Sequence, residues 1–396
     1  MKPASLLLPI ILALAAAAPP LAAEPAVRYV DDNAPADPGP GNPAVSDPLA
    51  DGTPAHPYDA IQKAINASAD GDVIVVLDGT YTGAGNRDIA FSDKALTLRS
   101  QNGPAGCVVN CQGSPQGARR AFLFTDASRA AYVEGFTITN GYAPVVWPDD
   151  PVGCGGAVLC KNASPAFRNC IFTLNYAGMG GAIYACGTAE TGNGPVVANC
   201  TFTANTAGVG GAVLAVENAR PAVSNSILWG DSTTELAQLP EGTGFSRASY
   251  SDIAGGYPGT GNIDADPLFA SASDLHLQSK YGRWTAAGWV CDAATNPCID
   301  AGDPASPCTL EPKPNFGRIN LGAYGNTPQA SKSGWNIPGD ANDDCRVNLL
   351  DLLFVRDRIG RDTATGDNWK ADVTNDGKVN LLDLLAVRDR LLTGCK

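Results

Sequence analysis

The stretch GGAVLCKNASPAFRNCIFTLNYAGM, Gly155–Met179, decides the fold because related versions of it follow directly. The second is GGAIYACGTAETGNGPVVANCTFTANTAGV from Gly180, and the third is GGAVLAVENARPAVSNSILWGDS from Gly210. Each holds short alternating apolar runs that are interrupted by Gly, Asn and Pro. This self-similarity predicts a solenoid whose successive coils stack about 4.8 Å apart as parallel strands.

Aligning the copies assigns side chains to the faces of each strand. Alternate residues of a strand point to opposite faces, so one parity forms the core. The expected inward columns are Phe136, Cys170, Cys200 and Ser226, and Ile138, Phe172, Phe202 and Leu228, while Thr139, Thr173, Thr203 and Trp229 point outward. Asn169, Asn199 and Asn225 share a turn, where we expect their stacked side-chain amides to form a hydrogen-bonded ladder.

The first residues have the pattern of a secretory signal peptide. Lys2 supplies the charged start, an apolar run follows from Leu6 to Ala18, and small residues place a cleavage site near Ala23. The run is too short to cross a membrane, and no second stretch approaches the ~20 apolar residues of a spanning helix. We therefore expect residues 1–23 to be removed from a secreted or cell-surface protein without a transmembrane segment.

The bulk composition excludes one class of partner and favours a folded chain. The 396 residues are 44% hydrophobic, which is enough for a core, and 44 Gly and 30 Pro indicate many turns. A formal net charge of −13 offers little to neutralise phosphates, so we expect no nucleic-acid partner. The excess of carboxylates suits calcium binding instead.

Twelve cysteines, an even number, suit an oxidising compartment and predict disulfides. Zinc is the alternative, but the chain has no CxxC pair and only two histidines, His56 and His276, which we expect to be structural. Other arrangements stay open. The candidates are local disulfides Cys107–Cys111 and Cys291–Cys298, stacked core thiols at Cys170 and Cys200 or their pairing with Cys160 and Cys186, and a clasp between Cys345 and Cys395.

The C-terminal end of the chain is duplicated. GDANDDCRVNLLDLLFVRDR, 339–358, returns as ADVTNDGKVNLLDLLAVRDR, 371–390. Side-chain oxygens fall at positions 1, 3, 5, 9 and 12 of each loop, with a backbone carbonyl at position 7, as in an EF-hand-type calcium loop. The expected ligands of two calcium ions are Asp340, Asn342, Asp344, Arg346, Asn348 and Asp351, then Asp372, Thr374, Asp376, Lys378, Asn380 and Asp383.

Several positions depart from the usual loop. Cys345 stands where a sharp turn normally takes glycine, Thr374 offers a neutral oxygen, and both loops end in Asp rather than Glu. The alternative interpretation is a pair of Asx-rich turns that cap two helices. Because the ligand spacing is met twice in register, we favour calcium.

The runs LLDLLFVRDRI and LLDLLAVRDRLL after the loops are helical and apolar on one face, and no helical pattern precedes either loop. This loop–helix duplication resembles a type I dockerin domain. The resemblance implies a module that folds around calcium and attaches an exported protein to a cohesin on a scaffold or cell surface. Its partner-reading positions are Leu349, Leu350, Leu381 and Leu382, with Arg356, Asp357, Arg388 and Asp389. The leucines could instead pack the two helices together.

The middle of the chain resembles right-handed parallel β-helix proteins of the pectate-lyase-like superfamily. HPYDAIQKAINASADGDVIVVLDGTYTG fits a capping helix, about 58–67, and the first strands; NSILWGDS, YSDIAGGYPGTGNIDADPLF and INLGAYG extend the resemblance over about 26–325. We expect an all-β right-handed parallel β-helix and then a small α-helical module. The expected divisions are a signal peptide at 1–23, the β-helix at 24–330, a linker at 331–338 and the dockerin-like module at 339–396.

Many members of the superfamily are polysaccharide lyases or glycoside hydrolases, so the resemblance implies candidate catalytic groups. The best paired carboxylates are Asp264 with Asp266 and Asp300 with Asp303, although Asp beside Pro or Gly commonly builds turns. Trp229 could stack on a sugar ring or be covered by the following segment. A lyase base would be Lys or Arg, but nothing ranks Arg119, Arg120, Lys161 and Arg168.

These observations support two hypotheses about function. The first is an exported protein that acts on or binds polysaccharide, as a lyase or an O-glycosyl hydrolase where it is an enzyme, and is tethered through its calcium-dependent dockerin-like module. The alternative is a non-enzymatic surface scaffold or adhesin that uses the same module for assembly. A groove lined by charged residues would favour the first, and a smooth surface rich in Thr and Asn the second.

Overall fold

The computed structural model describes residues 24–126, 131–144, 153–187, 193–239, 246–313, 315–333, 339–342, 347–362, 368, 371–374 and 378–391. The expected signal peptide, 1–23, and most of the expected linker, 331–338, lie outside these ranges. Within them, no helix is long and apolar enough to cross a membrane.

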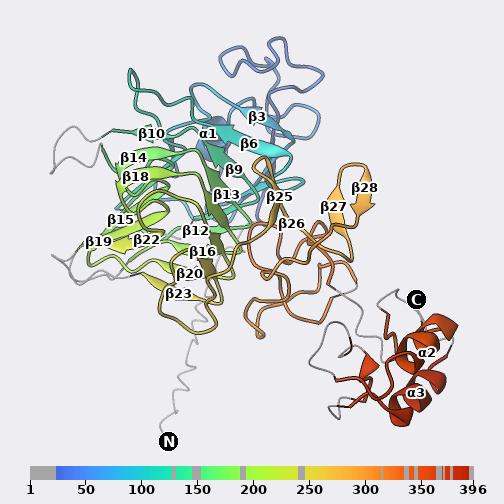
Figure 1. Cartoon of the computed structure of the whole chain (residues 1–396). Helices are drawn as coiled ribbons and strands as arrows, with labels where there is room; N and C mark the ends of the chain where they lie inside the picture. The colour runs from blue at the N-terminus through green and yellow to red at the C-terminus, as the bar shows by residue number, and fades with distance from the viewer. Residues whose placement is uncertain are drawn as a thin grey trace, which may run out of the picture.

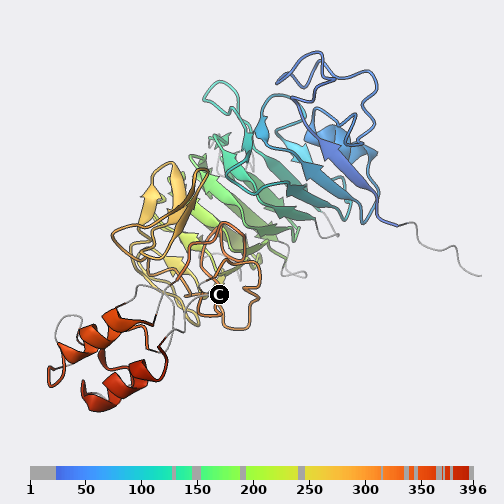
Figure 2. The ribbon, with the colours of Figure 1, turned by 90° about the vertical axis from the view of Figure 1, so that its right-hand side faces the viewer.

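Three parallel sheets run the length of the main body, as Figures 1 and 2 show. Sheet A contains β1 (Val27–Val30), β2 (Val73–Val76), β5 (Thr97–Ser100), β8 (Tyr132–Glu134), β12 (Ala166–Arg168), β16 (Val196–Ala198), β20 (Ala222–Ser224) and β23 (Arg247–Ser249). Sheet B contains β3 (Gly79–Tyr81), β6 (Cys107–Asn110), β9 (Thr137–Thr139), β13 (Ile171–Thr173), β17 (Thr201–Thr203), β21 (Ile227–Leu228) and β24 (Asp252–Ile253). Sheet C contains β4 (Ile89–Ala90), β7 (Phe122–Thr125), β11 (Val158–Lys161), β15 (Ile183–Gly187), β19 (Val213–Glu217) and β22 (Leu236–Gln238).

Smaller elements complete the described part of the chain. A fourth parallel sheet pairs β10 (Tyr142–Ala143), β14 (Tyr176–Met179) and β18 (Thr206–Val209). Two antiparallel pairs follow the coils, β25 (Phe269–Ser271) with β26 (Asp274–Leu277) and β27 (Arg283–Thr285) with β28 (Gly288–Val290). The helices are α1 (Ile61–Ala67), α2 (Leu349–Arg356) and α3 (Leu381–Arg388). The expected fold class, a parallel β-helix followed by a small helical module, is confirmed.

The inward columns predicted from the repeats form the core. Ile138, Phe172, Phe202 and Leu228 pair directly from β9 to β21 and are fully buried. The rings of Phe172 and Phe202 stack with centroids 4.6 Å apart and planes 7° from parallel. Cys170 and Cys200 lie two positions before Phe172 and Phe202, directly before β13 and β17, and both are buried, so they are stacked core thiols.

The expected cap covers the N-terminal end of this core. The helix α1 begins at Ile61, three residues later than predicted, and Ile61, Ala64 and Ile65 are buried in the core of the coils. The Asn86 side chain accepts a hydrogen bond from the Ile61 backbone N–H at 2.9 Å, which satisfies one of the free donors of the first turn.

The predicted ladder of Asn169, Asn199 and Asn225 is wrong in its partners. All three adopt positive φ near 50°, as a sharp bend between sheets A and B requires. Their amides bond the segment that follows the coils: Asn169 Nδ2 donates to the carbonyls of Ala323 and Gly325, and Asn199 Nδ2 to that of Asn320. The stacked bends therefore serve as a docking line for the C-terminal part of the β-helix domain.

An asparagine ladder does exist six residues further along each coil. The Asn205 Oδ1 atom accepts hydrogen bonds from the backbone N–H and the Nδ2 of Asn175, at 3.2 and 2.9 Å. In the next coil, Asp231 Oδ1 accepts the equivalent hydrogen bonds from the backbone N–H and the Nδ2 of Asn205, at 2.6 and 2.8 Å. The alignment contained this column, but its final Asp concealed the pattern.

The disulfide prediction fails for the cysteines that the structure describes, all of which are free thiols. Cys107 and Cys111 are four residues apart along the extended β6 and the residue after it, which separates them by about 13 Å at the usual strand rise. A disulfide needs Cα atoms within about 7 Å. The proposed partners Cys345 and Cys395 lie outside the described residues.

Replacing Phe202 with Ala tests the stacked core. Because the ring lies between two coils and is fully buried, we expect the free energy of unfolding to fall by about 3–5 kcal/mol. Urea denaturation followed by circular dichroism measures it. Thr203→Ala, next in the strand and half-buried, is the control and should change little. Equal effects of the two substitutions would contradict the assigned parity.

Candidate functional site

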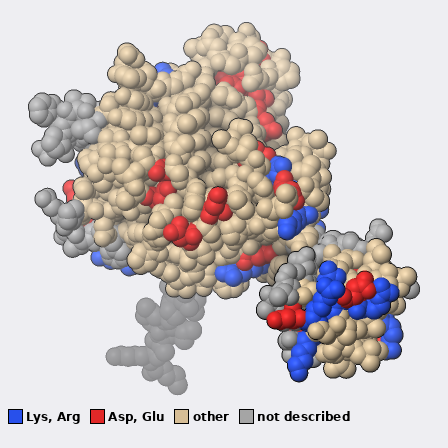
Figure 3. Space-filling model, in the orientation of Figure 1, with Lys and Arg blue, Asp and Glu red and all other residues tan. Residues whose placement is uncertain are grey.

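Two regions of the structure are candidates for a functional role. The first is the C-terminal module. Its core combines Val347 and Val355 with Val379 and Val387, one pair from each copy. The duplicated residues therefore pack against each other across the repeat. Figure 3 shows that Lys and Arg are more prominent on this module than on the visible face of the β-helix.

The last carboxylate of each predicted loop lies at its centre. Asp351 is fully buried and accepts hydrogen bonds from the backbone N–H groups of Ala341, Asn342 and Asn348 at 2.8 to 3.1 Å. Asp383 is fully buried as well, and it accepts three hydrogen bonds from Thr374 and Asn380. The two loops thus fold in the same way.

Asn348 and Asn380 also cap α2 and α3. Each side chain accepts from the N–H two residues on, and the Asp at the third helical position accepts from the cap residue, which makes a reciprocal capping box. The alternative of Asx-rich caps is therefore correct as local geometry. It does not compete with calcium, because capping leaves other carboxylate lone pairs free.

The described donors fit a hard cation. Neither Asp351 nor Asp383 pairs with any Lys or Arg that the structure describes, and a buried carboxylate without a compensating charge is costly. Each has three hydrogen bonds out of about four acceptor sites, which leaves room for a metal contact. Asp344, Arg346 and Asp376 lie outside the described residues, and no complete acidic metal cluster is found within them.

The structure decides between the two roles left open for the leucines. Leu349, Leu350, Leu381 and Leu382 expose 65, 57, 61 and 58% of their surface, so they do not pack the helices together. Arg356 and Arg388 are exposed too, each paired with the next residue, Asp357 or Asp389. Exposed apolar residues gathered on one small module indicate a protein-binding surface.

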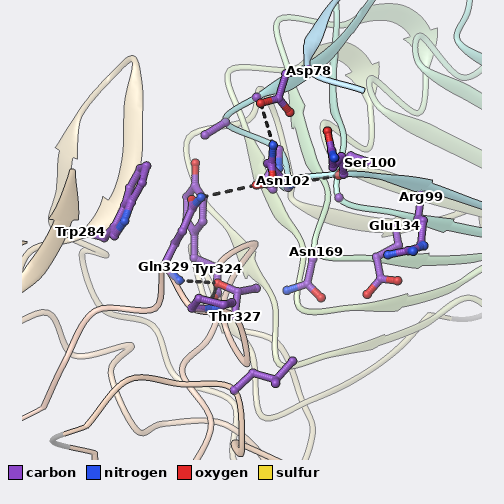
Figure 4. A pocket seen from close by; sticks show the side chains of 18 of the residues that line it. Asp78, Arg99, Ser100, Asn102, Glu134, Asn169, Trp284, Tyr324, Thr327 and Gln329 are labelled. Atoms are coloured by element: carbon purple, nitrogen blue, oxygen red, sulfur yellow. Dashed lines mark hydrogen bonds between the residues drawn. The ribbon is translucent and has the colours of Figure 1, made fainter. Parts of the chain in front are cut away.

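The second region is a groove of about 710 Å³ beside the β-helix. Asp78, Arg99, Asn102 and Glu134 line one wall, from the ends of sheet A strands and the turns after them. Trp284 of β27 stands across from Arg99 and Glu134 (Figure 4). The groove exists because the segment after the coils docks on the bends between sheets A and B, and Asn169, one of those bends, is in its lining.

A chain of polar contacts joins the two walls. Asn102 Nδ2 donates to Asp78 Oδ2 at 2.9 Å, and Gln329 Nε2 donates to the Asn102 carbonyl at 3.4 Å (Figure 4). Behind Gln329, the buried His276 ring stacks on Tyr324 at 3.6 Å between centroids and is held by Asp274. His276 is structural, as predicted, and it supports the aromatic side of the groove.

Glu134 is the most unusual acid of the groove. Its neighbours in register on sheet A are Arg99 and Arg168, on the strands to either side. Partial burial raises the pKa of Glu134, and the two arginines offset this only in part. A half-buried carboxyl that gains protons readily, next to two cations, can bind sugar hydroxyls or transfer a proton.

The carboxylates proposed from sequence lie elsewhere. Asp264, Asp266 and Asp303 accept backbone hydrogen bonds in turns, from Gly255, Leu268 and Ala305 respectively, and Asp300 is partly buried with a raised pKa caused by burial. None lines the groove. Trp229 is half-buried and packs against the cluster of Ile227, Leu277, Cys298 and Leu321, so the following segment covers it.

The sequence did not predict the groove, because its two walls come from distant parts of the chain. They lie side by side only when the segment after the coils packs against the β-helix. One feature could have identified Glu134 as a candidate: in the register of sheet A it lies between Arg99 and Arg168. Trp284 had none, because it lies outside the repeats in the antiparallel pair of β27 and β28.

Family models match two parts of the chain. Residues 338–392 match the family model described as the dockerin type I domain, a calcium-binding domain, and residues 245–302 match a model described as disaggregatase related. A solved structure described as a rhamnogalacturonan lyase aligns with 57% of this chain and 67% of its own, at 14% identity and a TM-score of 0.33. No curated protein matches the chain.

Replacing Asp351 with Ala tests the calcium loops. Calcium at 100 times its dissociation constant stabilises a site by about 2.7 kcal/mol, and we expect the substitution to remove this gain from the first loop. Thermal unfolding with calcium and after chelation measures the difference. Asp357→Ala, at the exposed end of α2, is the control. An unchanged response to calcium in Asp351→Ala would contradict the ligand assignment.

Proposed function

We propose that this chain is an exported polysaccharide-binding and polysaccharide-acting β-helix protein that is tethered through its calcium-dependent dockerin domain. The groove is the observation that carries the proposal. It brings an aromatic wall, amides and a perturbed acid to one concave site of a size that suits several sugar rings. The charged residues Asp78, Arg99 and Glu134 in the groove favour this function over the alternative, a non-enzymatic scaffold with a smooth surface.

The chemistry of the two walls is complementary to a pyranose chain. The apolar face of a sugar ring packs on an aromatic side chain such as Trp284, while its hydroxyls need donors and acceptors. Asn102, Gln329 and Glu134 offer these from the other parts of the lining. The wall formed by β5 and β8 belongs to sheet A, where Leu98 and Val133 are fully buried, so the backbone of this wall is already ordered before a ligand binds, which lowers the entropic cost of binding.

The proposal includes catalysis by ionisable side chains at the groove. A hydrolase would use a carboxylic acid to protonate the leaving oxygen, and Glu134 is the groove acid whose burial favours the protonated form. A lyase would use a basic side chain, and Arg99 and Arg168 flank the same position. The pairs Asp264–Asp266 and Asp300–Asp303 remain proposals for a site outside the groove.

The exposed leucines of the module support the tether. Two Leu–Leu pairs at the beginnings of α2 and α3 present apolar surface that the module does not use for its own core. A cohesin-like domain is the partner that a dockerin implies. The calcium loops would hold the pairs in position, because Asn348 and Asn380 directly precede them.

Replacing Trp284 with Ala tests the groove. We expect affinity for the bound polysaccharide to fall about tenfold, since one stacked ring contributes on the order of 1–1.5 kcal/mol. The full chain is titrated against neutral and uronic-acid polysaccharides with calcium present, and reducing ends and ultraviolet absorbance of unsaturated sugars are followed. Trp289→Ala, on β28 and outside the groove lining, is the matched control. Binding that survives in Trp284→Ala, or no binding across the panel, would reject the groove.

Replacing the leucines with Ser tests the tether. Because Leu349, Leu350, Leu381 and Leu382 are exposed, the four substitutions together should leave the calcium-dependent stability nearly unchanged. Binding to a panel of cohesin domains, measured by calorimetry, should be lost. Loss of stability would show that the leucines belong to the core, and retained binding would place the partner surface elsewhere.

A further inference from the structure

The asparagine ladder ends in an acid where the preceding coils have an amide. Asn175 and Asn205 each use Oδ1 to accept from the coil before, and Nδ2 to donate to the coil after. Asp231 accepts from Asn205 through Oδ1 in the same way, but a carboxylate has no N–H to donate. The last rung therefore ends in negative charge beneath the surface.

A second acid closes over this end. The Glu235 side chain is buried, and its Oε1 accepts a hydrogen bond from the Asp231 backbone N–H at 3.2 Å. The other oxygens of the pair, Asp231 Oδ2 and Glu235 Oε2, are shielded from solvent and have no hydrogen-bond partner. No Lys or Arg in the described part of the chain pairs with either acid.

Two adjacent ionised carboxylates cannot be buried cheaply without a cation or a proton between them. Burial, reinforced by Glu235, raises the pKa of Asp231 well above its ordinary range, and burial also raises the pKa of Glu235. The groups that face the pair are each other, the Asn205 side chain, and the backbone N–H groups of Gly230 and Asp231; among the residues that the structure describes, no other charged group acts on the pair. A proton held between the two otherwise unpartnered oxygens satisfies both at once.

We propose that Asp231 and Glu235 share one proton and form a pH-sensitive latch that fastens the last coils of the β-helix. The turn between the two acids leads directly into β22, the terminal strand of sheet C, which pairs with β19. When the shared proton is lost, the two charges repel, and residues 231–238 lose their attachment to the ladder.

The sign of the pH dependence follows from the raised pKa values. Below the ordinary carboxyl pKa of about 4, the two acids are protonated in both the closed and the open segment, and the latch is fully closed. As pH rises towards the folded-state values, the unfolded segment releases its protons first, so the free energy of opening falls. The latch is therefore weaker at pH 8 than at pH 5.

Hydrogen exchange of the full chain, followed by mass spectrometry with calcium fixed, tests the latch. After correction for intrinsic exchange, the opening of residues 229–239 should increase from pH 5 to pH 8, by up to tenfold for each pH unit over which the closed pair holds one proton more than the open segment. Asp231→Asn restores the donor that Asn175 and Asn205 have, so it should remove this increase and keep the segment closed. Glu235→Gln should also remove the increase.

Glu217→Gln is the matched control, because Glu217 is an exposed acid at the end of the neighbouring strand β19. It should keep the wild-type increase. A wild-type chain with no increase, an Asp231→Asn variant that keeps it, or both variants open at every pH would overturn the proposal.

Discussion

The sharp bend between sheets A and B is the constraint on which the rest of the structure depends. Each bend places one asparagine at positive φ, a conformation that Asn tolerates better than most residues. Repeating the bend at Asn169, Asn199 and Asn225 keeps successive coils in register, so that Phe172 stacks on Phe202 and the inward columns close. The same bends leave their side-chain amides on the outside of the stack, where they need partners.

Those amides connect the fold to the groove. They bond the carbonyls of Asn320, Ala323 and Gly325, which fixes the segment after the coils against the side of the β-helix. Tyr324 is buried in this docked segment and supports His276, which in turn lies beside Trp284. One feature of the repeat thus sets both the regular core and the irregular wall that faces Glu134.

The sequence was sufficient to predict the features that repeat along the chain. It did not predict contacts between segments that are far apart in sequence. Parity within the copies was enough to place Phe172 and Cys200 inside, and ligand spacing was enough to identify the two loops that end in Asp351 and Asp383. The partners of Asn169 lie 154 and 156 residues away, in a segment without periodicity, so no local pattern could reveal them. The prediction of a Cys107–Cys111 disulfide failed because a short spacing in sequence does not report the distance between two residues along an extended strand.

The structure combines a parallel β-helix, which carries a groove, with a small helical module whose leucines are exposed. We propose that the groove between the coil turns and the docked segment binds polysaccharide. Hydrogen exchange of the full chain with and without a saturating polysaccharide tests this most directly. We predict protection in both walls, residues 99–106 and 324–329, with none on β16 and β20. Protection confined to another surface, or absent while binding persists, would contradict the claim.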